Sequence, residues 1–164
     1  MINDYGHARL IIANNVIAHV DDLKDVFTGV KNLLTDDGAL VFEVHWVGNL
    51  IGDGGFDQIY HEHLCYFSLN ALLSLTEQFG LEIFDVELLP FHGQSLRVYA
   101  GKGFDKSEAV NIFLEKERKL GLREAEVFLK FADRVENNSK KLRDLLVRLK
   151  NEGKKVVGYG APAK

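Results

Sequence analysis

The 164-residue chain contains one cysteine, two prolines and one tryptophan, and these low counts limit what the protein can be. Because disulfides need paired cysteines, Cys65 alone excludes an internal disulfide framework and a cysteine-rich structural zinc site. No apolar run approaches the length that a membrane-spanning helix needs, and residues 1–7 lack the charged-then-apolar order of a signal peptide. We therefore expect a cytoplasmic protein that does not span a membrane.

Hydrophobic residues make up 46% of the chain and include eleven phenylalanines, which is typical of a folded globular protein. Charge is distributed unevenly along the sequence. Residues 1–100 hold four Lys and Arg against fourteen Asp and Glu, a net of −10, whereas residues 101–164 hold sixteen against ten, a net of +6. The contrast indicates two segments with different surroundings, although the whole chain carries only −4.

The first hundred residues predict a right-handed, parallel βαβ unit followed by a helix and an antiparallel strand pair. The expected elements are a buried strand at residues 9–15, a helix at 23–34 capped by Asp21 or Asp22, a turn at 35–38, a buried strand at 39–44, a functional or mobile loop at 46–56, a helix capped by Ser68 and closed by Gly80, and strands at 81–89 and 96–100.

The pattern changes beyond residue 101. Val110, Phe113 and Leu114 open a helix that Gly121 interrupts, and a second helix carries apolar residues at helical spacing up to Leu149. Lysines and arginines lie between these positions, which is typical of the solvated face of an amphipathic helix and not of a nucleic-acid surface. Residues 155–164 predict a strand that enters a glycine turn.

The densest chemistry lies in the string Tyr-His-Glu-His-Leu-Cys-Tyr, which begins at Tyr60. In an extended segment its histidines and cysteine point to one side, and its tyrosines and glutamate point to the other. One interpretation is a metal site formed by His61 and His63, with Cys65 as a third ligand. Another is acid–base catalysis, in which one histidine removes a proton while Glu62 or Tyr60 fixes its tautomer. A third places both histidines in a surface or structural hydrogen-bond network.

Polar residues also follow the predicted strands. Ligands of open parallel sheets bind beyond the carboxyl ends of the strands, so Asn15 and His19 suit a pocket, although they equally suit a helix-entry turn. By the same argument, Glu43 and His45 face one side of the sheet at the end of the second strand. Residues 92–95 predict a hairpin loop, and Arg97 suits either a phosphate group or a surface ion pair.

Five strings of the chain, in the same order, resemble the S-adenosylmethionine-dependent sugar C-methyltransferases, which methylate nucleotide-linked 4-keto deoxysugars. The strings are residues 13–20, 56–63, 66–68, 92–97 and 158–164, and together they extend over nearly the whole chain. The two strings that contain Tyr-His-Glu-His and Gly-Tyr-Gly-Ala-Pro-Ala-Lys are specific to the family, and the other three support the resemblance. One departure is Gln94, where the family usually has a second glycine.

The resemblance implies an α/β fold: the second half of a Rossmann-like class I methyltransferase sheet, with two parallel strands and then an antiparallel pair, followed by a helical segment. It places a partial methyltransferase-like domain at residues 1–103, a helical connector at 104–152 and the start of a C-terminal α/β domain at 153–164.

The resemblance also implies a mechanism, in which a base removes the proton beside the keto group and the resulting enolate attacks the methyl of S-adenosylmethionine. By similarity the base is His63, with Tyr60 and Glu62 as its neighbours in the site. The remaining implied residues are Asn14 and Asn15 toward the cofactor, with Asn15 also lining the sugar pocket, and His19, His92 and Arg97 toward the nucleotide-sugar substrate.

Members of this family are longer, and begin with a cysteine-rich zinc-binding region and a glycine-rich cofactor loop that this sequence does not contain. We therefore expect the chain alone to bind S-adenosylmethionine poorly and not to turn over. Its first strand would lack a neighbour, which predicts either a homo-oligomer or pairing with an upstream segment. Two alternatives remain: a non-catalytic binding or assembly module, and a metal-dependent enzyme that uses His61 and His63.

Overall fold

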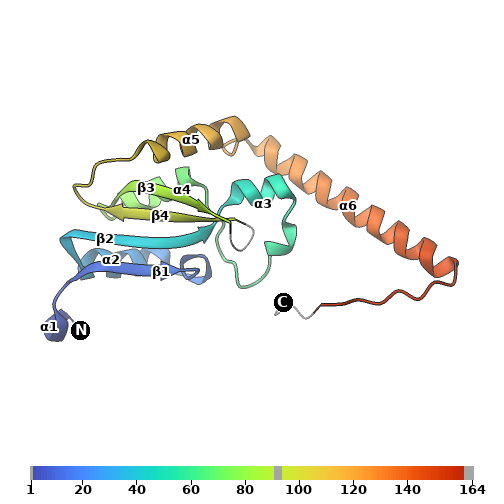
Figure 1. Cartoon of the computed structure of the whole chain (residues 1–164), viewed down its shortest axis with the longest axis horizontal. Helices are drawn as coiled ribbons and strands as arrows, with labels where there is room; N and C mark the ends of the chain where they lie inside the picture. Colours follow the sequence, from blue (N-terminus) through green and yellow to red (C-terminus); the bar gives the residue numbers. More distant parts are fainter. Residues whose placement is uncertain (1, 91–93, 161–164) are drawn as a thin grey trace.

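The computed structural model describes residues 2–90 and 94–160, which form a four-stranded sheet with helices on one face and a long helix leading away from it (Figure 1). The strands are β1 (Ala8–Asn14), β2 (Leu34–His45), β3 (Glu82–Leu89) and β4 (Ser95–Gly101). The helices are α1 (Ile2–Tyr5), α2 (Leu23–Leu33), α3 (Val47–Asp53), α4 (Leu69–Glu77), α5 (Glu108–Leu120) and α6 (Ala125–Asn151), with 3₁₀ turns η1 (Ile17–His19) and η2 (Phe56–Gln58).

The order of strands in the sheet is β1-β2-β4-β3. β1 pairs in parallel with β2, and β4 lies antiparallel to both β2 and β3. This confirms the predicted α/β class, with two parallel strands, an antiparallel pair and a helical segment. The carboxyl ends of β1 and β2 meet at the right-hand end of the sheet in Figure 1, next to α3.

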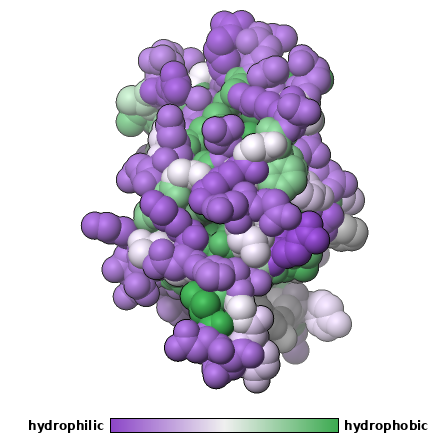
Figure 2. Space-filling view, turned by 90° about the vertical axis from the view of Figure 1, so that its left-hand side faces the viewer, coloured by the Kyte–Doolittle hydropathy of each residue, from purple (hydrophilic) through white to green (hydrophobic). Residues whose placement is uncertain are grey.

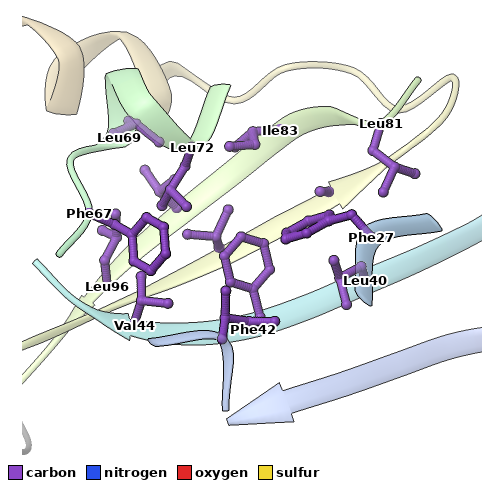
Figure 3. Close-up of a cluster of buried hydrophobic side chains, with 14 of the residues drawn as sticks. Phe27, Leu40, Phe42, Val44, Phe67, Leu69, Leu72, Leu81, Ile83 and Leu96 are labelled. Atoms are coloured by element: carbon purple, nitrogen blue, oxygen red, sulfur yellow. The ribbon is translucent and has the colours of Figure 1, made fainter. Parts of the chain in front are cut away.

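The core lies between one face of the sheet and helices α2, α4 and α5. Alternate residues of β2, namely Leu40, Phe42 and Val44, are at most 1% exposed and face this side. Figure 3 shows them directed at side chains from α2 and α4, among them Phe27 and Leu72. Burying a large apolar side chain contributes about 1.5–3 kcal/mol, so this layer fixes the sheet against the helices.

Helix ends follow the predicted capping residues. The Asp22 carboxylate accepts a hydrogen bond from the Asp25 amide at 2.9 Å, and the Ser68 hydroxyl oxygen accepts one from the Ala71 amide at 3.1 Å. Such bonds satisfy amides that have no partner within the first turn. Gly121 ends α5 with a φ of 69°, a conformation that glycine adopts without steric cost.

The loop predicted at residues 46–56 is wrong, because its first part is the helix α3. Glycines are typical of loops, which explains the prediction, but Gly48 is needed here for packing against the Trp46 ring. A Cβ at Gly48 would lie 2.3 Å from the ring of Trp46, so only glycine lets the indole fold back onto the helix. The Arg134 guanidinium of α6 donates to the carbonyl oxygens of Ile51 and Gly52, which fastens the long helix to α3.

Two further predictions are wrong: the turn at residues 35–38 and the strand that was expected to begin at residue 155. Residues 35–38 belong to β2, where the register jumps from Ala8 opposite Leu34 to Leu10 opposite Ala39, so the additional residues bulge instead of turning. Residues 154–160 form no strand and are exposed. A strand needs a neighbour for its backbone groups, and the described residues provide none there. The domain boundaries at residues 103 and 152 stay predictions.

β1 is an edge strand, because within residues 2–90 and 94–160 only β2 pairs with it. On the face away from the core, Leu10 is 54% exposed and Ile12 62%. Figure 2 shows the end of the molecule opposite the carboxyl ends of β1 and β2, which is largely hydrophilic, with apolar residues in separate patches. Among the described residues, no helix has both the length and the apolar character to cross a membrane.

Candidate active site

The segment after η2 is tied to the chain that follows both parallel strands. The Leu64 amide donates to the Ala18 carbonyl at 2.8 Å, and the Val47 amide donates to the Phe67 carbonyl at 2.9 Å. These bonds hold the histidine-rich string at the carboxyl edge of the sheet, where ligands of open parallel sheets bind.

His63 lies at the centre of this edge and is 7% exposed. The centroid of its ring lies 4.3 Å from that of Tyr60, 4.7 Å from that of His45 and 5.0 Å from that of His19. The structure therefore brings together Tyr60 and His63 from one string of the sequence, His19 from the chain after β1, and His45 from the end of β2, all of which the sequence marks as candidates.

The hydrogen bonds of His63 define its tautomer. Its Nδ1 lies 2.8 Å from the Gln58 carbonyl oxygen, which can only accept, so Nδ1 carries the proton. In the neutral ring Nε2 then keeps its lone pair, and it faces the Tyr60 hydroxyl at 3.2 Å. The Tyr66 hydroxyl donates to the same Gln58 carbonyl at 3.4 Å. The result is a buried imidazole whose basic nitrogen faces a phenol.

The expectation of an extended segment is wrong at its start, because the His63 amide donates to the Tyr60 carbonyl at 3.0 Å and closes a turn. This turn places Tyr60 against His63 and leaves His61 and Glu62 exposed. Glu62 contributes its backbone carbonyl, which accepts from Nδ1 of His19 at 2.8 Å. In the part of the chain that the structure describes, no three His, Cys, Asp or Glu side chains are grouped to hold a metal ion.

Asn15 directly follows β1 and has a φ of 54°, and its amide donates to the Glu43 carbonyl at 3.2 Å. Its side-chain oxygen is buried and has no hydrogen-bond partner among the described residues. A buried acceptor without a partner suits a ligand that donates, such as a hydroxyl or ammonium group. Its neighbour Asn14 is exposed at the end of the strand.

Arg97 lies in an ion-pair row across β2, β4 and β3. Its guanidinium donates to Glu43 at 2.6 Å and to Glu87 at 3.2 Å, and the Glu43 carboxylate raises the pKa of the arginine. This is the ion pair that the sequence analysis gave as the alternative to a phosphate contact. The phosphate role stays a prediction, and His92 lies outside the described residues.

A cavity of about 140 Å³ adjoins His45, between β2, α3 and η2. Its polar lining comes from His45, Asn49, Asp53, Asp57, Gln58 and Gln94. A larger hollow of about 400 Å³ between α4 and α5 contains none of the predicted site residues. The smaller cavity is the one that adjoins the His63 cluster, because Gln58 and His45 also contact His63.

Two residues near the site, Gln58 and Glu117, are not among those that the sequence predicts for it. No pattern marks Gln58, because it acts through its backbone carbonyl. Glu117 is a buried carboxylate on α5, and a signal for it does exist: it follows Val110 and Phe113 at the spacing of the apolar face, where a further apolar residue is expected.

Comparison with known proteins gives matches over nearly the whole chain. Residues 3–86 match the family described as a methyltransferase domain, and residues 90–164 match the family described as a C-methyltransferase C-terminal domain. The chain is similar to C-methyltransferase NovU of Streptomyces niveus, with 39% identity over 163 residues. That match covers 98% of this chain and 39% of NovU, so the chain spans about two fifths of the relative's length.

Solved methyltransferase structures are also similar to the chain. An O-methyltransferase, NcsB1 from neocarzinostatin biosynthesis, has 21% identity and a TM-score of 0.44, with 58% of this chain and 29% of that chain covered. Magnesium protoporphyrin IX methyltransferase (ChlM) of Synechocystis PCC 6803 has 11% identity and a TM-score of 0.44, with 59% and 46% covered. The match to the methyltransferase domain covers just over half of the chain, so the chain belongs to that methyltransferase family, and its remaining residues are similar to a C-methyltransferase C-terminal domain.

Proposed function

We propose that this chain supplies the catalytic-base half of an enzyme that transfers a methyl group from S-adenosylmethionine to the carbon beside the keto group of a nucleotide-linked deoxysugar. The observation that supports this most is the state of His63. It is buried, its proton is held on Nδ1 by the Gln58 carbonyl, and Nε2 is left as a base beside the Tyr60 hydroxyl.

In this proposal Nε2 of His63 removes the proton beside the keto group. A general base of this kind contributes about 10²- to 10⁴-fold to a rate, and it works best when its orientation is fixed. The Gln58 carbonyl provides that orientation, because the hydrogen bond at Nδ1 prevents the ring from turning over. The Tyr60 hydroxyl is hydrogen-bonded to Nε2. The substrate therefore either replaces the hydroxyl at Nε2, or gives its proton to the phenol oxygen while the phenol proton moves to Nε2.

The residues at the end of β1 fit a cofactor with hydroxyl and ammonium groups. The buried side-chain oxygen of Asn15 is an acceptor without a partner among the described residues. We assign it to a hydroxyl or ammonium group of the cofactor, and we assign Asn14 to the same cofactor. S-adenosylmethionine, when bound, would supply a methyl group from its positively charged sulfur: an electron-rich carbon bonds to the methyl carbon while the methyl–sulfur bond breaks and leaves a neutral thioether. No residue of this chain needs to act as an acid in that step.

We assign the sugar to the space between His19, His63 and the cavity beside His45. Its lining of amides and carboxylates suits hydroxyl groups, which donate to such oxygens. Arg97 reaches a nucleotide phosphate only if its ion pairs with Glu43 and Glu87 open. Glu62 and His92 complete the proposed set, Glu62 next to the base and His92 on the substrate side.

A binding assay tests the proposal. Isothermal titration with S-adenosylmethionine and with a nucleotide-linked 4-keto deoxysugar is run on this chain and on an extended protein that carries a glycine-rich strand–turn–helix ahead of residue 1. We expect weak cofactor binding by the chain alone and methyl transfer only by the extended protein. Micromolar cofactor binding by the chain alone contradicts the half-site proposal. An extended protein that binds both ligands without methyl transfer favours a non-catalytic binding module.

A further inference from the structure

Glu117 on α5 is 1% exposed, and its carboxylate accepts four hydrogen bonds. The donors are the Trp46 indole at 2.8 Å, the Leu69 amide at 2.5 Å, and both the amide and the side-chain nitrogen of Asn70, at 3.0 and 2.9 Å. A buried carboxylate is tolerated when donors surround it in this way, and its bonds are stronger than those between neutral groups. Glu117 is therefore a junction between three distant parts of the chain.

Two of those parts carry the candidate site. Trp46 directly follows His45 at the end of β2, and Leu69 begins α4 directly after the segment that carries His63. Trp46 also forms a parallel bridge with Phe67, so these two stretches lie side by side. The same carboxylate oxygen, Oε1 of Glu117, accepts from the Trp46 indole and from the Leu69 amide, so it joins the two stretches on which the rings of His45 and His63 lie 4.7 Å apart.

The indole of Trp46 is held in place from other directions as well. The Phe113 ring packs edge-on at 4.9 Å between centroids, and the Lys116 ammonium lies 4.5 Å from the indole centroid. Since Phe113, Lys116 and Glu117 all lie on α5, this helix determines how the indole N–H is directed. The other side of the junction is supported by Arg123, which donates to the Asn70 side-chain oxygen at 2.8 Å.

We propose that Glu117 is a positioning residue for the active site: through Trp46 and the start of α4 it sets the place of His63 relative to His45. The inference rests on the proposed role of His63. It means that the helical segment after the sheet is part of the catalytic machinery. Loss of the carboxylate leaves the indole N–H and the amides of Leu69 and Asn70 buried without an acceptor, which favours their separation.

The test uses two spectroscopic signals of the chain without ligands. Trp46 is the only tryptophan, so its fluorescence reports on the junction alone, and the Hε1 proton resonance of His63 reports on the ring contacts in the site. We expect Glu117→Gln to shift both signals, because its amide donates where the carboxylate accepted. The matched control is Glu115→Gln on the same helix, a half-exposed residue paired with Arg118, which should shift neither signal.

The result that overturns the proposal is a folded Glu117→Gln variant with an unchanged His63 resonance, even if the Trp46 emission moves, because the carboxylate would then be structural only. Should that variant fail to fold, Asn70→Ala carries the test. It removes one donor and keeps the Trp46 bond, so we expect a smaller shift of His63, and an unchanged resonance overturns the proposal. Because no substrate is present, failure of the proposed function leaves these outcomes unaffected.

Discussion

The Tyr60 hydroxyl oxygen lies 3.2 Å from Nε2 of His63, and Nδ1 of the same ring lies 2.8 Å from the Gln58 carbonyl oxygen. The imidazole is thus held at both nitrogens by groups of different kinds, one that only accepts and one that can donate. The turn that closes between Tyr60 and His63 produces this arrangement, because it folds the phenol back over the ring three residues later.

Replacing His63 removes the proposed base. In the extended protein we expect His63→Ala to slow exchange of the substrate proton beside the keto group by about 10²- to 10⁴-fold, the usual contribution of a general base. Deuterium exchange followed by NMR measures this step without methyl transfer. The control is His61→Ala, an exposed neighbour in the same turn, which should exchange at the wild-type rate. Equal rates for the two variants would remove His63 from the mechanism.

Alkaline pH should weaken the fold through Tyr66. Burial raises the pKa of its hydroxyl above the ordinary 10.0, so above that pH the folded chain keeps a proton that the unfolded chain releases. The stabilisation is complete below pH 10.0, and the free energy of unfolding falls as the pH rises from there through the raised value. Urea unfolding at several pH values should show a smaller fall for Tyr66→Phe. Identical slopes for both proteins would contradict this account.

Core packing should depend strongly on Phe27. Its ring is 0% exposed, stacks on Phe79 at 5.5 Å and meets Phe42 edge-on at 6.1 Å. We expect Phe27→Ala to lower the free energy of unfolding by about 3–5 kcal/mol, the cost of a cavity of this size. Leu129→Ala on α6, where the side chain is 66% exposed, should change it by less than about 0.5 kcal/mol. Urea unfolding followed by Trp46 fluorescence compares the two.

The edge of β1 should associate with another strand. We expect light scattering of the chain to give twice the mass of one chain, because an unpaired edge with exposed Leu10 and Ile12 invites pairing. Ile12→Lys should return the monomer, since a charge on an edge strand opposes pairing. Val147→Lys, a similar change on exposed α6, should not. A wild-type chain that stays monomeric at high concentration would refute pairing across this edge.

Local signals in the sequence predicted most of the fold. The apolar runs of β1 and β2, the caps at Asp22 and Ser68 and the helical spacing of α6 depend on residues near one another in the chain. The prediction was wrong at two places where residue type does not reveal the backbone conformation. Gly48 lies in a helix, where its missing Cβ makes room for the Trp46 ring, and the turn before His63 could not be seen in a string that alternates like a strand.

For the site as well, the sequence predicted some residues and missed others. Tyr60, His63 and His19 are recognisable by residue type and by their places after strands, and the structure brings them together. Residue type does not mark Gln58, because it acts on His63 through a backbone carbonyl. Glu117 is placed by tertiary packing, since it bonds residues 47 to 71 positions away. The assigned roles of all these residues remain proposals for the experiments above.

The strand order has a consequence for any attempt to exchange parts between relatives. The first family match ends at residue 86, within β3, and the second begins at residue 90, before β4, so the two strands fall on either side of the boundary between the matches. Yet β4 lies between β2 and β3, and among the described strands it is the only one that joins β3 to the sheet. A chimera spliced at this seam would graft a foreign strand into the middle of the sheet. Exchange should therefore keep β2, β3, β4 and α5 from a single parent.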